Sequence, residues 1–213
     1  KRQHFRYEYE IITANGERKL VLELGQGIYG PDGEVEALEG IILDISERKQ
    51  FEDNLKYLNE HDRLTGLYNR EYLERLMEKD LKNPGDKKLA LIGFNLSTVQ
   101  LLTANYGFQY TQNLIRKAAD LLAELCPSNA MLFKTYENRF LYYIKGYKDT
   151  KELSDIAENT AAVLEKMFAS ERIGGGISIL EIGRDEKVEV DLLLKRLLIA
   201  SEKSINKSDR EFK

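Results

Sequence analysis

The stretch "LALIGF", from Leu89 to Phe94, constrains the fold more than any other feature of the chain. Such a short, nearly all-apolar run predicts a central strand that is buried on both faces of a sheet. Apolar residues at helical spacing on either side of the run predict amphipathic helices. These are Leu73, Leu76, Met77 and Leu81; Leu114, Ile115, Ala118, Leu121, Leu122 and Leu125; Leu153, Ile156, Ala157, Val163, Leu164 and Met167; and Leu193, Leu194, Leu197 and Leu198. With a short helix near Val99 to Ala104 and a strand in "GGGISILEI", the order predicts an α/β sandwich, with helices packed over a mixed sheet.

The segment Phe133 to Tyr143, "FKTYENRFLYY", is predicted to form two short strands joined by a tight turn. The turn carries Tyr136, Glu137, Asn138 and Arg139. The strand alternation that follows places Phe140 toward the core. The polar turn between two apolar strands makes this hairpin a candidate site.

Residues 1–48 have a different texture from the rest of the chain. Apolar and polar residues alternate around Asn15-Gly16 and around the turn Gly30 to Gly33. This pattern predicts a three-stranded antiparallel meander, which is marginal as an independent unit because one apolar face is left uncovered. The chain begins at Lys1 without a methionine, and we expect it to be a fragment of a longer protein.

From Asp44 onward the pattern becomes helical, with Phe51, Leu55 and Leu58 at spacings of four and three. This stripe spans little more than one heptad, whereas a coiled coil needs about three or four. Two interpretations stay open: a solvated connector, or a short parallel contact between two copies of the chain.

Charge and composition narrow the partners. Lys and Arg total 32 against 36 for Asp and Glu, so the net charge of −4 provides no basic field for a nucleic acid. No apolar run is long enough to predict a membrane span, and no segment resembles a signal peptide. The single Cys126 has no disulfide partner and fits a reducing, cytoplasmic location. With only two histidines and no second cysteine, we expect no zinc site.

The segment "DRLTGLYNR", from Asp62 to Arg70, resembles the DxLTGLxNR signature that opens GGDEF domains, the catalytic domains of diguanylate cyclases. Every fixed position of the pattern is present: Asp62, Leu64, Thr65, Gly66, Leu67, Asn69 and Arg70. The meander, which closes in "DISERK" at Asp44 to Lys49, resembles the C-terminal half of a PAS domain. These resemblances imply a PAS fragment at 1–48, a signalling helix at 49–61 and a GGDEF domain of nucleotide-cyclase-like fold at 62–213.

The resemblance implies a chemistry as well as a fold. GGDEF domains condense two GTP molecules into cyclic di-GMP, and each subunit of a dimer holds one GTP. Mg²⁺ or Mn²⁺ must neutralise the triphosphate, which requires carboxylates from neighbouring strands. Two glycines let the hairpin approach the phosphates closely.

Few of the residues that the family uses for this chemistry are present. The pair Tyr106-Gly107 aligns with the YG pair of the family's first metal-binding motif. The metal-binding aspartate then falls on Asn95, and the second acidic position falls on Ser97. The two guanine-contacting positions fall on Thr103 and Gln112.

The hairpin turn departs from the family at all four of its glycine and acidic positions. With Phe140 aligned to the final phenylalanine of GGDEF, the two glycines become Tyr136 and Glu137, and the acidic pair becomes Asn138 and Arg139. The family's RxxD product-inhibition motif falls on "PSNA" at 127–130, and its phosphate-contacting lysine falls on Ser208.

Replacing these acidic residues opposes metal binding. A unit charge about 4 Å from another contributes roughly 4 kcal/mol at an effective dielectric near 20, so Arg139 in place of a carboxylate repels a divalent ion. Asn95 in place of the other carboxylate leaves no charged protein ligand, and shifting the register to use Glu137 would displace Phe140 from the core. Arg139 itself has two interpretations, of which a solvated hairpin side chain is favoured over a direct grip on phosphate.

The sequence therefore predicts a non-catalytic, degenerate GGDEF signalling module of a bacterial PAS-GGDEF protein. We expect it to form a homodimer and to regulate an adjacent domain of the same polypeptide, for which family resemblance suggests an EAL phosphodiesterase. Two alternatives remain: an allosteric domain that binds GTP without turnover, and an active cyclase. We expect no cofactor unless the cyclase alternative holds, in which case Mg²⁺ or Mn²⁺ is required.

Overall fold

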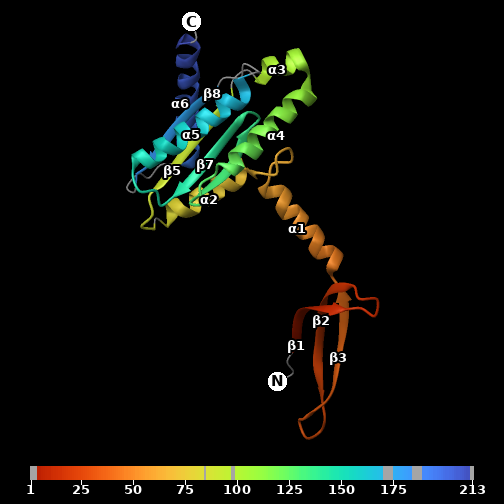
Figure 1. The fold of residues 1–213 in the computed structure, drawn as a ribbon. Helices are drawn as coiled ribbons and strands as arrows, with labels where there is room; N and C mark the ends of the chain where they lie inside the picture. Colours follow the sequence, from red (N-terminus) through yellow and green to blue (C-terminus); the bar gives the residue numbers. More distant parts are fainter. Residues whose placement is uncertain (1–3, 84, 97–98, 170–174, 184–188, 212–213) are drawn as a thin grey trace. The chain divides into compact units, whose positions relative to one another are not determined.

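The computed structural model describes residues 4–83, 85–96, 99–169, 175–183 and 189–211, with residues 203–211 described by their backbone alone. The chain divides into two compact units, Lys1–Leu58 and Asn59–Lys213. Figure 1 traces the elements of each unit along the chain. Among the described residues, no helix has both the length and the apolar character that a membrane crossing requires.

The first unit is a three-stranded antiparallel sheet. Its strands are β1 (His4–Ile12), β2 (Arg18–Tyr29) and β3 (Val35–Asp44), and β2 lies between the other two. The connecting turns contain Gly16 and Gly33, whose φ angles of 80° and 84° are strained for residues with a Cβ. The meander predicted from the alternation is confirmed.

Helix α1 (Ser46–Glu60) follows β3. Its start is fixed to the sheet, since Ser46 Oγ accepts a hydrogen bond of 2.9 Å from the backbone N–H of Leu20. The apolar stripe Phe51, Leu55 and Leu58 is exposed along the helix, and none of the residues of α1 is buried. The structure thus keeps the predicted helix and leaves its apolar stripe accessible.

The second unit contains the mixed sheet and its helices. Its strands are β4 (Tyr68–Asn69), β5 (Leu89–Leu96), β6 (Ala130–Tyr136), β7 (Arg139–Lys145) and β8 (Gly175–Ile182). Their order across the sheet is β4-β6-β7-β5-β8, with β4 parallel to β6 and all other pairs antiparallel. Its helices are α2 (Arg70–Lys82), α3 (Val99–Tyr106), α4 (Phe108–Glu124), α5 (Thr150–Phe168) and α6 (Val190–Glu211).

Strand β5 contains the apolar run "LALIGF" and is buried from Ala90 to Leu96. It pairs with β7 on one side and β8 on the other. An added Cβ at Gly93 would lie 3.0 Å from the Leu197 side chain, so the small residue allows α6 to pack closely on the strand. The predicted central strand is confirmed.

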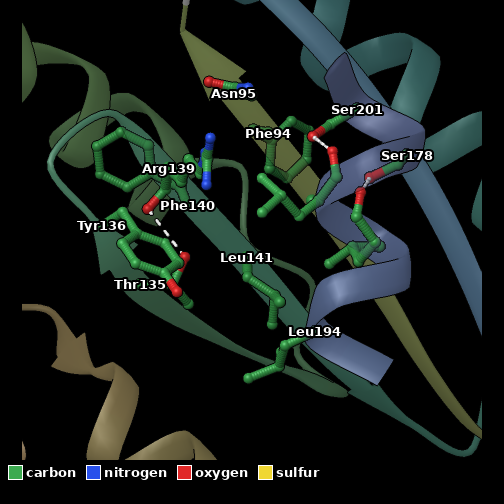
Figure 2. Close-up of a pocket in the computed structure, with 13 residues that line it drawn as sticks. Phe94, Asn95, Thr135, Tyr136, Arg139, Phe140, Leu141, Ser178, Leu194 and Ser201 are labelled. Carbon is green, nitrogen blue, oxygen red and sulfur yellow. Dashed lines mark hydrogen bonds between the residues drawn. The ribbon is translucent and has the colours of Figure 1, made fainter. Parts of the chain in front are cut away.

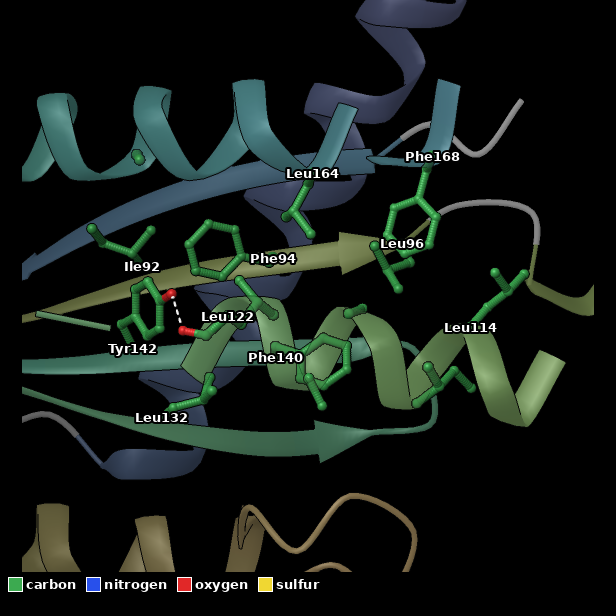
Figure 3. Packing of buried hydrophobic residues seen from close by; sticks show 14 of the residues in the cluster. Ile92, Phe94, Leu96, Leu114, Leu122, Leu132, Phe140, Tyr142, Leu164 and Phe168 are labelled. Atoms are coloured by element: carbon green, nitrogen blue, oxygen red, sulfur yellow. Dashed lines mark hydrogen bonds between the residues drawn. The ribbon is translucent and has the colours of Figure 1, made fainter. Parts of the chain in front are cut away.

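Helices cover both faces of the sheet. On one face, α2 and α6 enclose a cluster that includes Leu73, Leu141 and Leu193, and Leu194 packs beside Leu141 (Figure 2). On the other face, α3, α4 and α5 enclose a larger cluster of apolar side chains, shown in Figure 3. There the Tyr142 hydroxyl donates a hydrogen bond of 2.6 Å to the Leu122 carbonyl, which satisfies a buried polar atom. The α/β sandwich predicted from the sequence is confirmed.

Candidate functional site

The predicted hairpin is formed by β6 and β7. The two strands are joined by a turn at Glu137 and Asn138, and Tyr136 lies opposite Arg139 in the register. Phe140 is fully buried in the cluster beneath α4. The predicted core position of Phe140 is confirmed, although β7 is buried at every position from Phe140 to Ile144.

A pair of asparagine side chains joins this turn to the end of β5. Asn138 Nδ2 donates to Asn95 Oδ1 at 3.0 Å and to the carbonyl of Leu96 at 2.6 Å. The backbone N–H of Leu96 donates in return to the Asn138 carbonyl at 2.9 Å. The two positions predicted from the sequence resemblance to be metal-ligand positions, Asn95 and Asn138, are therefore occupied by neutral amides that bond to each other.

The asparagine pair changes the electrostatics of the strand ends. Asn95 is buried, and its amide oxygen accepts from Asn138, so neither side chain presents a free anionic oxygen. Hard divalent ions prefer several oxygen ligands, including carboxylates. Within the described part of the chain, no cluster of three or more acidic, histidine or cysteine side chains is arranged to hold a metal ion. Ser97, the other predicted acidic position, lies outside the described residues.

Tyr136, at the end of β6, lies between two guanidinium groups. The Arg70 Cζ atom is 5.0 Å from the centre of the Tyr136 ring, and the Arg139 Cζ atom is 5.2 Å from it. Arg70 also donates a hydrogen bond to the Tyr136 hydroxyl. Each guanidinium is thus within cation–π distance of the ring.

The two arginines connect the turn to α6. Arg139 pairs with Glu202 at 3.0 Å, and Arg70 pairs with Asp191 at 3.1 Å. The Arg139 side chain is only 23% exposed, so the favoured hypothesis that it is a solvated hairpin side chain is wrong. The reason is that α6 supplies a carboxylate partner, which a reading of the hairpin alone does not detect. We call Arg70, Tyr136, Arg139, Asp191 and Glu202 the arginine–tyrosine clamp.

The cavity beside the turn is small (Figure 2). It lies between β5, the hairpin and α6, has a volume of about 30 Å³, and is lined by Asn95, Tyr136, Arg139 and mainly apolar residues of α6. This volume accommodates about one or two water molecules, far less than a nucleotide.

A wider cleft of about 600 Å³ lies on the other side of the turn. Lys134 and Arg70 are its only cations among the described lining residues. Four carboxylates line the same cleft: Asp62, Glu71, Glu74 and Glu137. The excess of negative charge opposes binding of a triphosphate.

The predicted guanine-contacting positions lie on α3 and α4. The Thr103 hydroxyl donates to the Val99 carbonyl at 3.0 Å and lies 3.0 Å from the Thr111 hydroxyl. Gln112 is half-buried on α4, next to Thr111. The two helices are therefore packed together, but the Thr103 hydroxyl is already engaged in a hydrogen bond to the Val99 carbonyl.

The signature segment forms a tight turn around Asp62. Asp62 Oδ1 accepts hydrogen bonds from the backbone N–H of Thr65 at 3.0 Å and from its hydroxyl at 2.7 Å. Asp62 Oδ2 forms an ion pair with Lys134 Nζ at 3.0 Å, and the Lys134 side chain is 10% exposed. Burial acts to raise the pKa of Asp62, but the bonds from Thr65 and Lys134 outweigh it and lower the pKa.

The other signature residues also have structural roles. Gly66 has a φ of 71°, which favours glycine, and Leu64 and Leu67 pack against the cluster beneath α4. Asn69 caps α2, as its spacing predicts, because its side chain accepts a 2.9 Å bond from the Tyr72 N–H. Together with Arg70 in the clamp, every fixed position of the signature contributes to the scaffold.

The sequence alone did not identify three residues that contribute to this site, namely Lys134, Asp191 and Glu202. Lys134 was detectable, because a lone basic residue in an otherwise apolar strand requires a buried partner. Asp191 and Glu202 were not detectable, since their partners lie far away in the sequence. The segment 127–130 forms the turn that leads into β6, whose first residue is Ala130, and the Ala130 N–H donates to the Pro127 carbonyl at 3.0 Å. The side chain of Ser208 lies outside the described residues.

The family described as "Diguanylate cyclase, GGDEF domain" matches residues 59–197. The chain belongs to the GGDEF family. The match covers the whole mixed sheet and the beginning of α6 up to Leu197, so the unit that carries the hairpin is the GGDEF domain.

Curated relatives of this GGDEF protein are distant and longer. An uncharacterised protein, y4lL of Sinorhizobium fredii, is 27% identical over 78% of the chain and 21% of its own length. Diguanylate cyclase VdcA of Vibrio cholerae is 27% identical over 73% of the chain and 46% of its own length. The chain thus spans about a fifth of one relative and about half of the other.

Solved GGDEF structures share the fold. The coiled coil and GGDEF domain of DgcB from Caulobacter crescentus, in complex with c-di-GMP, has a TM-score of 0.65 at 13% identity and covers 78% of this chain and 89% of that one. The S helix-GGDEF-EAL structure of Vibrio cholerae LapD has a TM-score of 0.63 at 18% identity, covering 77% and 38%. The FimX GGDEF domain from Pseudomonas aeruginosa has a TM-score of 0.57 at 20% identity, covering 70% and 94%. At these low identities the likeness shows a shared GGDEF fold.

Proposed function

We propose that this chain is a non-catalytic GGDEF signalling module. The observation that carries the proposal is the hydrogen bond between Asn95 and Asn138, at the aligned metal-binding positions. A divalent ion coordinated there would have to break this bond and would gain only neutral oxygens in return. Because GTP condensation depends on such ions, the loss of both carboxylates removes the chemistry and leaves the fold.

The turn residues add a second obstacle to catalysis. Tyr136 and Glu137 replace the glycines that let a hairpin approach phosphates, and Tyr136 is held between Arg70 and Arg139. Approach of a triphosphate would require these contacts of Tyr136 to open and would bring the phosphates near the Glu137 carboxylate. Both effects oppose substrate binding as well as turnover.

The alternative of a GTP receptor has less support. The Thr103 hydroxyl already donates to the Val99 carbonyl, so it cannot also donate to guanine without breaking that bond. The wide cleft beside the turn has an excess of carboxylates. Both observations favour a domain that acts as a folded scaffold over one that acts as a GTP receptor.

We further propose that the scaffold regulates an adjacent domain of a longer cytoplasmic protein. The curated relatives are much longer than this chain, and the LapD structure named above joins a GGDEF domain to an EAL domain. The N-terminal sheet is interpreted as the C-terminal part of a PAS domain and α1 as the signalling helix. In this arrangement α1 pairs with a second copy through Phe51, Leu55 and Leu58.

Incubation with GTP and either Mg²⁺ or Mn²⁺ tests the proposal. We expect no cyclic di-GMP by chromatography with mass detection, even with protein at concentrations near that of GTP. VdcA under identical conditions serves as the positive control. Formation of cyclic di-GMP by the purified chain, abolished by an Asn95→Ala substitution, would overturn the proposal.

A further inference from the structure

Arg139 carries a buried nitrogen for which the protein supplies no acceptor. Its Nη2 atom donates to Glu202 Oε1 at 3.0 Å, but its Nε atom is shielded from solvent and has no hydrogen-bond partner. Among the described residues, it is the only buried side-chain nitrogen or oxygen of which this is true. Because leaving an N–H unpaired inside a protein is costly, we expect an acceptor there that is not a protein group.

The small cavity beside the turn provides the space for such an acceptor. Arg139 lines this cavity, which has a volume of about 30 Å³ (Figure 2). A cavity needs roughly 10–15 Å³ and two to four polar partners to hold a water molecule. Two further polar side chains, those of the buried Ser178 and Ser201, line the same cavity. The cavity is therefore large enough and polar enough for a small occupant.

The hydrogen bonds of the two serines restrict what this occupant can be. The Ser178 hydroxyl donates to the Leu197 carbonyl at 3.1 Å, and the Ser201 hydroxyl donates to the Leu198 carbonyl at 2.8 Å. Each hydroxyl hydrogen is thus already used, so each serine oxygen can only accept a further bond. The Nε–H of Arg139 can only donate. An occupant that joins them must accept from the arginine and donate to a serine.

Charge restricts the occupant further. A halide could accept a bond from Nε, but the positive charge of Arg139 is already balanced by Glu202, and a halide has no hydrogen to donate to a serine. A metal cation cannot accept a hydrogen bond, and it would be repelled by the guanidinium group. Water is small and neutral, and it both accepts and donates hydrogen bonds.

We propose that this cavity is a binding site for an ordered water molecule. The water accepts a hydrogen bond from Arg139 Nε and donates one to the oxygen of Ser178 or Ser201. Ser178 belongs to β8 and Ser201 to α6, so the water links the hairpin to one of these two elements. Buried waters of this kind complete polar networks and are costly to remove. The site depends on neither GTP nor a metal ion, so it stands apart from the proposed function.

A crystal structure of the full chain, at a resolution that shows ordered waters, tests the proposal. We expect a density peak in the cavity within about 3.2 Å of Arg139 Nε and of a serine oxygen. Crystals grown with bromide in place of chloride distinguish water from a halide, because bromide gives a strong anomalous signal and water does not. We expect no anomalous peak in the cavity.

Two substitutions of Arg139 test whether its Nε–H holds the water. Arg139→Met places a methyl group where Nε lies, whereas Arg139→Gln, the matched control, places an amide N–H there. Both variants lose the guanidinium group and the ion pair with Glu202, so they differ mainly in the hydrogen-bond donor. We expect the glutamine variant to keep the water and the methionine variant to lose it. In solution, ¹⁷O magnetic relaxation dispersion should show about one long-lived water fewer for methionine than for glutamine.

The wild-type crystal decides the matter even if a variant fails to fold. The proposal is overturned if the wild-type cavity shows no density at a resolution where other buried waters are visible, or if a bromide ion occupies it. It is also overturned if Arg139→Met keeps the density, or if Arg139→Gln loses it as Arg139→Met does, because Nε–H would then not be the group that holds the water.

Discussion

Replacing Tyr136 with alanine should destabilise the GGDEF domain, because the ring holds the arginine–tyrosine clamp together. The substitution removes cation–π contacts with Arg70 and Arg139, each contributing about 0.5–1 kcal/mol at a partly exposed site. It also removes the hydrogen bond from Arg70 to the tyrosine hydroxyl, which is partly screened by water. The expected total is about 2 kcal/mol in the free energy of unfolding.

Urea unfolding followed by circular dichroism at 222 nm measures this loss, since most of the helices belong to the GGDEF domain. A loss of about 2 kcal/mol corresponds to a fall in Tm of about 4–8 °C for a domain of this size. Tyr136→Phe is the matched control, because it keeps the ring and removes only the hydroxyl. It should cost no more than about 1 kcal/mol.

A gain in stability on substitution of Tyr136 would instead be typical of an active-site residue. Residues of working active sites often lower stability, so replacing them commonly stabilises the protein. An increase in stability for Tyr136→Ala, or equal losses for alanine and phenylalanine, would refute the conclusion that the turn has become a structural contact.

Three further predictions follow from the same contacts. Asn138→Asp should lower the free energy of unfolding by about 1–3 kcal/mol, because a carboxylate would face the amide oxygen of Asn95 and the Leu96 carbonyl. Asn95→Asp should lower it by less, because Asn138 can still donate a hydrogen bond to the new carboxylate. Chemical unfolding of both variants checks this order. Asp62→Asn should destabilise the protein at pH 7. Since folding lowers the pKa of Asp62 below 3.8, its contribution is present above that pH and is lost as the pH falls through the lower folded value, so unfolding curves of variant and wild type should converge in acid. Leu55→Asp should lower the average mass seen by light scattering if the exposed stripe on α1 joins two copies, and an unchanged mass would reject that contact.

Local pattern was sufficient to predict most of the fold. The apolar run predicts the burial of β5, because a strand covered on both faces favours apolar side chains, and β7 is likewise buried from Phe140 to Ile144. Asn69 predicted the start of α2, since its side chain can accept a bond from the first turn. The φ of Gly16 and Gly33 explains why the meander turns where the sequence indicates.

The candidate site was only partly predictable. The sequence locates Asn95 and Asn138, but not their mutual hydrogen bond, because that depends on how the hairpin packs against β5. The partners of Arg139 and Arg70 lie on α6, and no periodicity links residues so distant in the chain. The turn sequence alone therefore predicts a solvent-exposed Arg139 side chain, whereas tertiary packing places this side chain in an ion pair with Glu202.

Binding of Mn²⁺ in the presence of GTP tests the central claim most directly, since the claim is that the scaffold remains without its metal ligands. Electron paramagnetic resonance measures free Mn²⁺ as the full chain is added to a fixed mixture of the ion and GTP, with VdcA as the positive control. We predict that the chain leaves the free Mn²⁺ signal unchanged, and that Asn95→Ala behaves like the wild type. A stoichiometric loss of the signal that Asn95→Ala abolishes would contradict the account.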